Sequence, residues 1–205
     1  MLFEHIFIDN RALKTLVLLH GTGGTKSDFL FLNDRLQKTF NLLALQGNVL
    51  EQGMPRFFRR IRPGVFDQDN IKKEAEKLHQ FVSNWRSEHS IQVNDLVFLG
   101  YSNGANMILA TLFYHPQSIR FAVLLHPMLP FIPQDISLKE HSLLVSAGLH
   151  DPMVSLSQQK ILEETLIEKD TNVIIKKYPG GHELSNQEIK DVIEFLNSTK
   201  VTINL

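Results

Sequence analysis

The chain has 205 residues, no cysteine and a formal net charge of −1. The absence of cysteine excludes a disulfide, a thiolate metal site, an iron–sulfur cluster and a cysteine nucleophile. A hydrophobic fraction of 43% and a charged fraction of 21% are typical of a soluble globular protein. The near-neutral charge argues against nucleic acid or an anionic membrane as a partner, because both are bound through an excess of Lys and Arg.

The sequence contains no segment typical of secretion or membrane insertion. Its N-terminus lacks the basic start and long apolar run of a signal peptide. The longest apolar stretches are too short to cross a bilayer or are interrupted by His126, Pro127 and Pro130. We therefore expect a single domain over residues 1–205, located in the cytoplasm and without a membrane partner.

Short apolar runs alternate along the chain with longer amphipathic segments. The apolar runs predict strands over Phe3–Ile8, Thr15–Leu19, Asn41–Leu45, Leu96–Leu99, Phe121–Leu125, Ser142–Ser146 and Asn172–Tyr178. The intervening segments predict helices over Asp69–Glu88, Asn103–Tyr114 and Val154–Lys169, and a last helix that opens with the capping-box pattern Ser185-Asn186-Gln187-Glu188. This alternation predicts an α/β fold in which a mostly parallel central sheet of about seven strands is flanked by helices.

The most informative motif is Gly100-Tyr101-Ser102-Asn103-Gly104, which reads G-x-S-x-G between a predicted strand and a predicted helix. In that context the serine lies at a sharp, strained turn that exposes its hydroxyl above the sheet. The pattern alone is common, but a strand before it and a helix after it are not. Ser102 is therefore the predicted nucleophile.

A serine nucleophile needs a base, and the base needs an acid that orients it. Asp151 follows the predicted strand Ser142–Ser146, and His182 follows the predicted strand Asn172–Tyr178. The order Ser, Asp, His is that of α/β hydrolases, and the carboxyl ends of parallel strands meet at one sheet edge. Each residue alone has a plainer interpretation, Asp151 as a helix cap and His182 as a structural histidine. Their joint placement favours an orienting acid and a general base.

A second glycine-rich loop, His20-Gly21-Thr22-Gly23-Gly24-Thr25-Lys26, follows the predicted strand Thr15–Leu19. It lacks the glycines that a Walker loop or a dinucleotide fingerprint requires, so no nucleotide cofactor is expected. We predict instead that the backbone amides of Thr22 and Asn103 form an oxyanion hole. A plain strand–turn–helix loop is the alternative.

Residues 47–68 are expected to form a long, irregular loop, and such loops are often functional. It contains the interleaved basic and aromatic segment Arg56-Phe57-Phe58-Arg59-Arg60-Ile61-Arg62. We assign Phe57, Phe58 and Arg59 to substrate binding, together with His126, which follows the strand Phe121–Leu125. The alternative is a solvated basic stretch with buried phenylalanines. No spacing typical of a metal site is present, so no metal is expected.

These motifs together resemble the phospholipase/carboxylesterase branch of the α/β-hydrolase superfamily, and especially small bacterial hydrolases associated with hydroquinone and quinone stress. The matching segments are His20-Gly21-Thr22-Gly23-Gly24, Gly47-Asn48-Val49-Leu50-Glu51, Pro55-Arg56-Phe57-Phe58-Arg59-Arg60, Gly100-Tyr101-Ser102-Asn103-Gly104-Ala105-Asn106, His126-Pro127-Met128, Asp151-Pro152 and Gly181-His182-Glu183-Leu184. The resemblance implies an α/β-hydrolase fold without a lid domain, Ser102 as nucleophile, His182 as base and Asp151 as orienting acid. It also implies carboxylesterase, lysophospholipase or thioesterase activity, and a possible homodimer.

The leading hypothesis is a serine hydrolase that cleaves small carboxylic esters through an acyl-enzyme on Ser102. A non-catalytic protein of the same fold that binds or senses a small molecule is the main alternative, because fold does not determine function. Lyase chemistry at the same serine and histidine, without an acyl-enzyme, is a third possibility.

Overall fold

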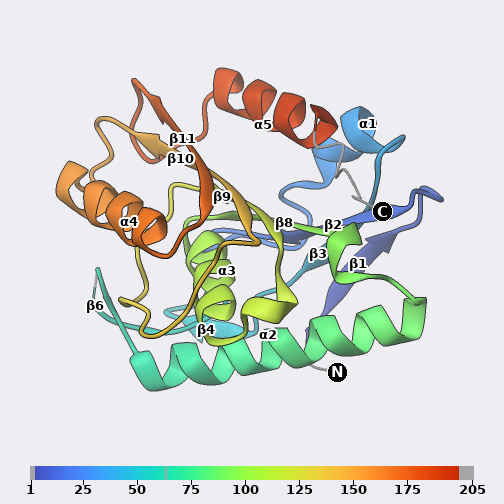
Figure 1. Cartoon of the computed structure of the whole chain (residues 1–205), viewed down its shortest axis with the longest axis horizontal. Helices are drawn as coiled ribbons and strands as arrows, with labels where there is room; N and C mark the ends of the chain where they lie inside the picture. Colours follow the sequence, from blue (N-terminus) through green and yellow to red (C-terminus); the bar gives the residue numbers. More distant parts are fainter. Residues whose placement is uncertain (1–2, 63, 199–205) are drawn as a thin grey trace.

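A seven-stranded sheet with the order β1-β3-β2-β8-β9-β10-β11 forms the centre of the computed structural model (Figure 1). Residues 3–62 and 64–198 are described, so the ends of the predicted domain 1–205 lie outside these ranges. The strands of this sheet are β1 (His5–Ile8), β2 (Lys14–Leu19), β3 (Phe40–Leu45), β8 (Leu96–Tyr101), β9 (Phe121–Leu125), β10 (Ser142–Gly148) and β11 (Asn172–Tyr178). All neighbours are parallel except β1, which is antiparallel to β3. The predicted, mostly parallel sheet is therefore confirmed.

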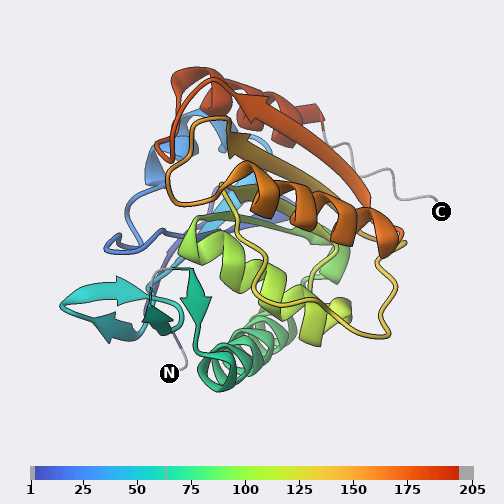
Figure 2. The ribbon, with the colours of Figure 1, turned by 90° about the vertical axis from the view of Figure 1, so that its left-hand side faces the viewer.

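Helices cover both faces of the sheet, as Figures 1 and 2 show. One face carries α2 (Gln68–His89), α3 (Asn103–Tyr114) and α4 (Leu156–Glu168), and the other carries α1 (Asn33–Leu36) and α5 (Asn186–Ser198). Short 3-10 turns occupy Leu30–Leu32, Val93–Asp95 and Pro116–Ser118. The inner strands β2, β3, β8 and β9 are largely apolar without alternation because each of their faces packs against a helical layer, whereas the edge strand β11 is partly exposed. Among the described helices, none is both long enough and apolar enough to span a bilayer.

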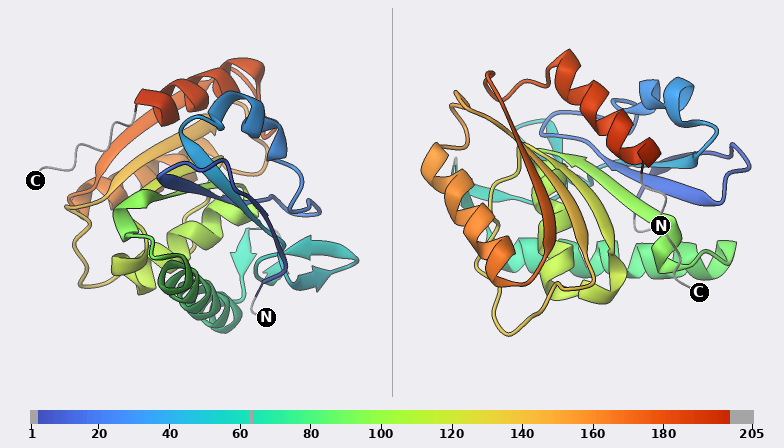
Figure 3. Two further views of the ribbon diagram at one scale, coloured as in Figure 1. Left: turned by 90° about the vertical axis from the view of Figure 1, so that its right-hand side faces the viewer. Right: turned by 45° about the horizontal axis from the view of Figure 1, so that its top comes forward.

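Figure 3 shows the helical layers on the two sides of the sheet from two further directions. A hydrophobic cluster lies between each layer and the sheet. The helix α2 contributes Ile71, Leu78 and Val82 to the larger cluster, at the helical spacing that the sequence predicts. On the opposite face, Val192 and Leu196 of α5 pack into the smaller cluster. The strands are thus packed between apolar helix faces. This packing fixes the position of the sheet edge at which the parallel strands end.

Capping residues define where two of the helices begin. At the start of α4, the Ser155 hydroxyl accepts a hydrogen bond from the backbone amide of Gln158, and the Gln158 side chain accepts one from the backbone amide of Ser155. The helix therefore begins at Leu156 rather than at the predicted Val154. Before α5, the amide of Glu188 donates to Ser185 Oγ over 3.1 Å, and the amide of Ser185 donates to Glu188 Oε2 over 3.4 Å. The capping box predicted at this position is therefore confirmed.

Residues 47–68, which were expected to be irregular, contain two short antiparallel hairpins. These are β4 (Val49–Glu51) with β5 (Met54–Arg56), and β6 (Arg60–Arg62) with β7 (Val65–Phe66). Gln52 and Gly53 both have positive φ values, of 53° and 78°, the conformation that a two-residue hairpin turn requires. The strands are too short and too polar for hydrophobic periodicity to reveal them. Figure 2 shows the first hairpin on the side of the sheet where β10 and β11 end.

Candidate active site

Ser102 lies at the sharp turn between β8 and α3, as the G-x-S-x-G motif predicts. Its backbone is strained, with φ 51° and ψ −110°, and its amide donates to the carbonyl of Leu125 over 2.8 Å. A Cβ atom at Gly100 would lie 2.6 Å from the backbone of Gly104, and one at Gly104 would overlap the carbonyl of Leu19. Both positions therefore require glycine for this close approach of β2, β8 and α3.

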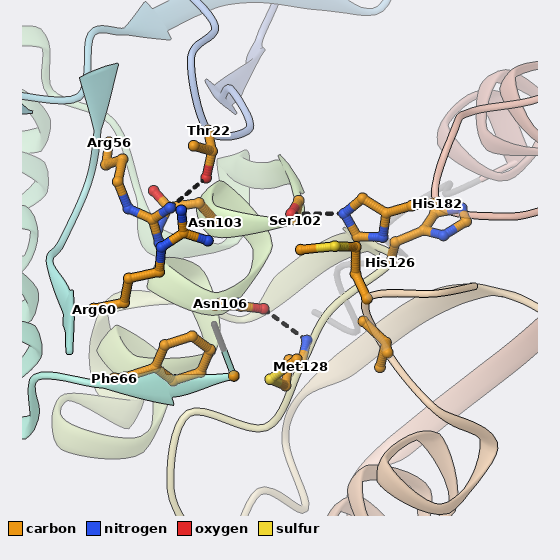
Figure 4. Close-up of a pocket in the computed structure, with 13 residues that line it drawn as sticks. Thr22, Arg56, Arg60, Phe66, Ser102, Asn103, Asn106, His126, Met128 and His182 are labelled. Carbon is orange, nitrogen blue, oxygen red and sulfur yellow. Dashed lines mark hydrogen bonds between the residues drawn. The ribbon is translucent and has the colours of Figure 1, made fainter. Parts of the chain in front are cut away.

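The structure brings Ser102 together with His182 and Asp151. The Ser102 hydroxyl lies 2.9 Å from His182 Nε2, and His182 Nδ1 lies 2.7 Å from Asp151 Oδ2 (Figure 4). His182 is in the loop after β11, and Asp151 is in the loop after β10. Because the carboxylate only accepts, Nδ1 carries the proton and Nε2 is free to accept from the serine. This is the geometry of a nucleophile, a base and an orienting acid.

Several donors fix the Asp151 carboxylate. Its Oδ1 accepts from the backbone amides of Met153 and Val154 at 2.7 and 3.0 Å, while its Oδ2 faces His182. Burial alone would raise the pKa of Asp151, but the hydrogen bonds from His182, Met153 and His126 outweigh it and lower this pKa. Asp151 is therefore ionised at neutral pH and can orient the base.

A second buried imidazole lies behind Asp151. His126 Nδ1 is 3.1 Å from Asp151 Oδ2, and His126 Nε2 is 3.1 Å from Glu188 Oε1. All three side chains are only 1% exposed. The hydroxyl of Ser146 also donates to Glu188. Burial acts to lower the pKa of His126, but the hydrogen bonds and charges of Glu188 and Asp151 outweigh it and raise this pKa. With a carboxylate at each ring nitrogen, His126 is held as an imidazolium.

His126, Asp151 and His182 present ligand atoms that all lie within 4.8 Å of one another, a spacing that a metal ion could bridge. Asp151 Oδ2, however, accepts hydrogen bonds from both imidazoles. The ring nitrogens nearest to it therefore carry protons, which a metal ion would have to displace. The arrangement is that of a hydrogen-bonded series in which Asp151 lies between two imidazoles.

A pocket opens beside Ser102 and has a volume of about 410 Å³ including its mouth. Its lining residues are Thr22, Arg56, Arg60, Gly64, Phe66, Ser102, Asn103, Asn106, His126, Met128, Met153, Val154 and His182. Figure 4 shows Thr22 and Asn103 across Ser102 from His182. Asn103 is the first residue of α3, where backbone N–H groups are unpaired and the helix dipole is positive. The oxyanion role of the Thr22 and Asn103 amides remains a prediction.

The structure places Phe57 and Phe58 in the hydrophobic core rather than at the pocket. Both side chains are fully buried; Phe57 packs beside His20, and Phe58 makes an edge contact with Phe66. Neither residue lines the pocket. The alternative of buried phenylalanines therefore describes this segment, in which both rings lie in the bend between β5 and β6.

The arginines of the same segment also differ from expectation. Arg59 is 60% exposed, pairs with Asp67 over 3.3 Å and lies outside the pocket lining. The arginines that do line the pocket are Arg56 and Arg60, which the sequence interpretation had not selected. His126 does line the pocket, but both of its ring nitrogens are engaged by carboxylates. Glu188 was also missed, since its capping-box position indicated only a helix start.

Two loops at the site are joined by a buried histidine. His20 Nδ1 donates to the carbonyl of Gly21 over 2.6 Å, and His20 Nε2 accepts from the amide of Gly47 and from Gln46 Nε2 at 2.9 and 3.0 Å. Burial lowers the pKa of His20, in keeping with this neutral tautomer. The ring therefore holds the loop that carries Thr22 to the loop that follows β3.

Comparisons with known proteins agree with this architecture. The model of the phospholipase/carboxylesterase family matches residues 6–200. MhqD of Bacillus subtilis, which is named as a hydrolase, is 32% identical over 195 residues, covering 94% of this chain and 96% of MhqD. The crystal structure of a Bacillus cereus carboxylesterase superposes with a TM-score of 0.88 at 35% identity, covering 95% and 93% of the two chains. A carboxylesterase from Mesorhizobium loti gives a TM-score of 0.88 at 28% identity, covering 97% and 96%.

Proposed function

Because the chain belongs to the phospholipase/carboxylesterase family, we propose that it is a serine carboxylesterase that cleaves small carboxylic esters through an acyl-enzyme on Ser102. The observation that carries this proposal is the hydrogen-bonded series from Ser102 through His182 to the ionised Asp151. A protein that only bound a small molecule would have no need of this alignment at a strained turn.

In the first half-reaction, His182 Nε2 takes the proton of Ser102 as Oγ attacks the ester carbonyl. The resulting oxyanion is held by the backbone amides of Thr22 and Asn103. The imidazolium of His182, stabilised by Asp151, then protonates the leaving alcohol, and the acyl group remains on Ser102. Water activated by His182 hydrolyses that ester, which releases the acid and restores the free serine.

The size of the pocket supports a small substrate. The volume of about 410 Å³ includes the open mouth, so the enclosed space beside Ser102 is much smaller. A thioester presents the same carbonyl and would follow the same steps, so thioesterase activity belongs to the same proposal. A lysophospholipid would leave its long acyl chain largely outside this space.

A fluorophosphonate probe tests the proposal directly. We expect one covalent adduct, mapped by mass spectrometry to Ser102, and no adduct on S102A. We also expect the wild-type protein to turn over 4-nitrophenyl acetate and S102A to be inactive. A folded wild-type protein that forms no Ser102 adduct would refute the acyl-enzyme. Ligand binding without turnover across an ester panel would favour the binding or sensor protein instead.

A further inference from the structure

One wall of the active-site pocket carries a group of hydrogen-bond donors, formed by Arg56 at the end of β5, Arg60 at the start of β6 and Asn103 at the start of α3. Figure 4 shows the two guanidinium groups side by side and next to Asn103, on the Thr22 side of the pocket. The side chain of Arg56 is 3% exposed and that of Arg60 is 21% exposed. Two cations and an amide thus converge in a space that opens to Ser102.

The partners of the two arginines leave this wall positively charged. Arg56 donates through Nε to the carbonyl of Phe58 over 3.0 Å and through Nη1 to Thr22 Oγ1 over 2.7 Å. Both arginines share one carboxylate, Glu51, at 3.5 Å from Arg56 Nε and 2.5 Å from Arg60 Nε. Glu51 does not line the pocket. Arg56, Arg60 and Glu51 together therefore have a net charge of +1, and the two cations line the pocket.

The pKa of Arg56 reflects its burial and the second positive charge beside it. Burial acts most strongly to lower the pKa of Arg56, the charge of Glu51 raises it, and the neighbouring charge of Arg60 lowers it further, so that the pKa ends below its ordinary value. A guanidinium nevertheless stays protonated at any physiological pH. Placing a buried guanidinium beside a second, partly exposed one costs free energy unless a further negative group compensates them.

The amide of Asn103 is an independent sign of a missing acceptor. Its Oδ1 accepts from the backbone amide of Phe57 over 2.7 Å, which fixes the orientation of the side chain. Its Nδ2 is buried and has no hydrogen-bond partner among the described residues, although Asn103 is only 1% exposed. Buried donors in folded proteins are almost always satisfied. A ligand oxygen in the pocket would satisfy this one.

We propose that Arg56, Arg60 and the Asn103 amide form an anion subsite, so that the preferred substrates are small carboxylic esters carrying a separate carboxylate or phosphate group. A neutral hydroxyl would accept one of these hydrogen bonds but would leave the net charge uncompensated. A carboxylate or phosphate accepts from several donors at once and matches the planar guanidinium. This inference rests on the proposed esterase function and specifies its substrate class.

The test compares pairs of esters that differ in charge but little in size. On the acyl side, mono-4-nitrophenyl glutarate is compared with 4-nitrophenyl pentanoate. On the alcohol side, 4-acetoxybenzoate and 4-acetoxyphenyl phosphate are compared with 4-methylphenyl acetate. Hydrolysis is followed by pH-stat, so that one assay serves all five. We expect at least one anionic ester to exceed its neutral partner by roughly 10- to 100-fold in kcat/KM, as expected for hydrogen bonds to charged groups.

Variants of Arg60 assign the effect to the subsite. We expect R60Q to lower kcat/KM for the anionic ester by a much larger factor than for its neutral partner, and R60K to retain part of the preference. Arg62 is an exposed arginine of the same strand that does not line the pocket, so R62Q is the matched control and should preserve the preference. Should R60Q fail to fold by circular dichroism, E51Q replaces it; removing this carboxylate should strengthen the preference for the anion.

The outcomes separate this inference from the proposed function. Equal rates for neutral and anionic partners would overturn the anion subsite but leave the esterase intact. A parallel loss on both substrates in R60Q would also overturn it, because it would show a structural role only. Absence of hydrolysis of all five esters, together with absence of a fluorophosphonate adduct, would refute the esterase itself.

Discussion

Replacing His126 with asparagine tests whether a buried cation holds the acid of the site in place. His126 lies between Asp151 and Glu188, at 3.1 Å from each carboxylate. Its backbone has a positive φ of 49°, which asparagine tolerates better than most residues. The substitution therefore removes the charge and shortens the side chain without adding backbone strain.

The burial of these groups sets the size of the expected effect. All three side chains are 1% exposed, so H126N leaves two buried carboxylates without their shared cation. Removal of one partner from a buried ion pair usually costs about 3–5 kcal/mol, and we expect a loss of that order in the free energy of unfolding. The double variant H126N/E188Q removes one of the two negative charges, and it should recover a large part of this loss.

Urea unfolding across pH supplies the second readout. The pKa of His126 is raised in the folded state, so its stabilisation is fully present below the unfolded pKa of about 6.5 and is lost as pH rises through the folded pKa. The difference in the free energy of unfolding between wild type and H126N/E188Q should therefore shrink as pH rises above about 6.5. A loss below about 1 kcal/mol in H126N, or a pH-independent difference, would refute the buried imidazolium.

Three further predictions concern Phe58, Tyr101 and Arg59. F58A should lose about 3–5 kcal/mol of stability by urea unfolding, since the ring is fully buried, and should change KM equally for aromatic and acetate esters; a selective effect on aromatic esters would place Phe58 at the pocket after all. Y101F removes the hydroxyl that donates to the His182 carbonyl over 2.8 Å, and it should lower the free energy of unfolding by about 1 kcal/mol. Because burial raises the pKa of Tyr101 to about 12, the variant should also lack one tyrosine titration in that range. R59Q breaks only an exposed ion pair with Asp67, so KM should stay unchanged and stability should change by less than about 1 kcal/mol; a raised KM would contradict its position outside the pocket.

The order of Ser102, Asp151 and His182 could be predicted because each follows a strand that hydrophobic pattern alone identifies. Parallel strands end at the same sheet edge, so the loops after β8, β10 and β11 meet there whatever their internal conformation. Local sequence supplies the strands, and topology supplies the proximity. The distances of 2.9 and 2.7 Å between the reactive atoms depend on the loops and required the structure.

The side-chain directions in residues 56–62 could not be predicted in the same way. Residues 57–59 lie between β5 and β6, where no periodicity relates a residue's position to the direction of its side chain. Within the short strand β6, a one-residue error in position would reverse every assignment. Arg59 precedes β6 and pairs with Asp67 outside the pocket, whereas Arg60 begins β6 and faces the pocket. Nothing in two consecutive arginines distinguishes them, because the difference comes from where each hairpin begins.

The carboxylate of Glu188 combines a local and a tertiary role. In most capping boxes the acidic side chain at this position reaches back to the backbone of the capping residue and otherwise faces water. Here it accepts from the amide of Ser185, from the hydroxyl of Ser146 on β10 and from His126 after β9, and it is 1% exposed. A buried carboxylate needs a cation or several donors, and this one has both. Since Ser185 follows His182 by only three residues, the contacts that begin α5 also restrain the loop that carries the proposed base.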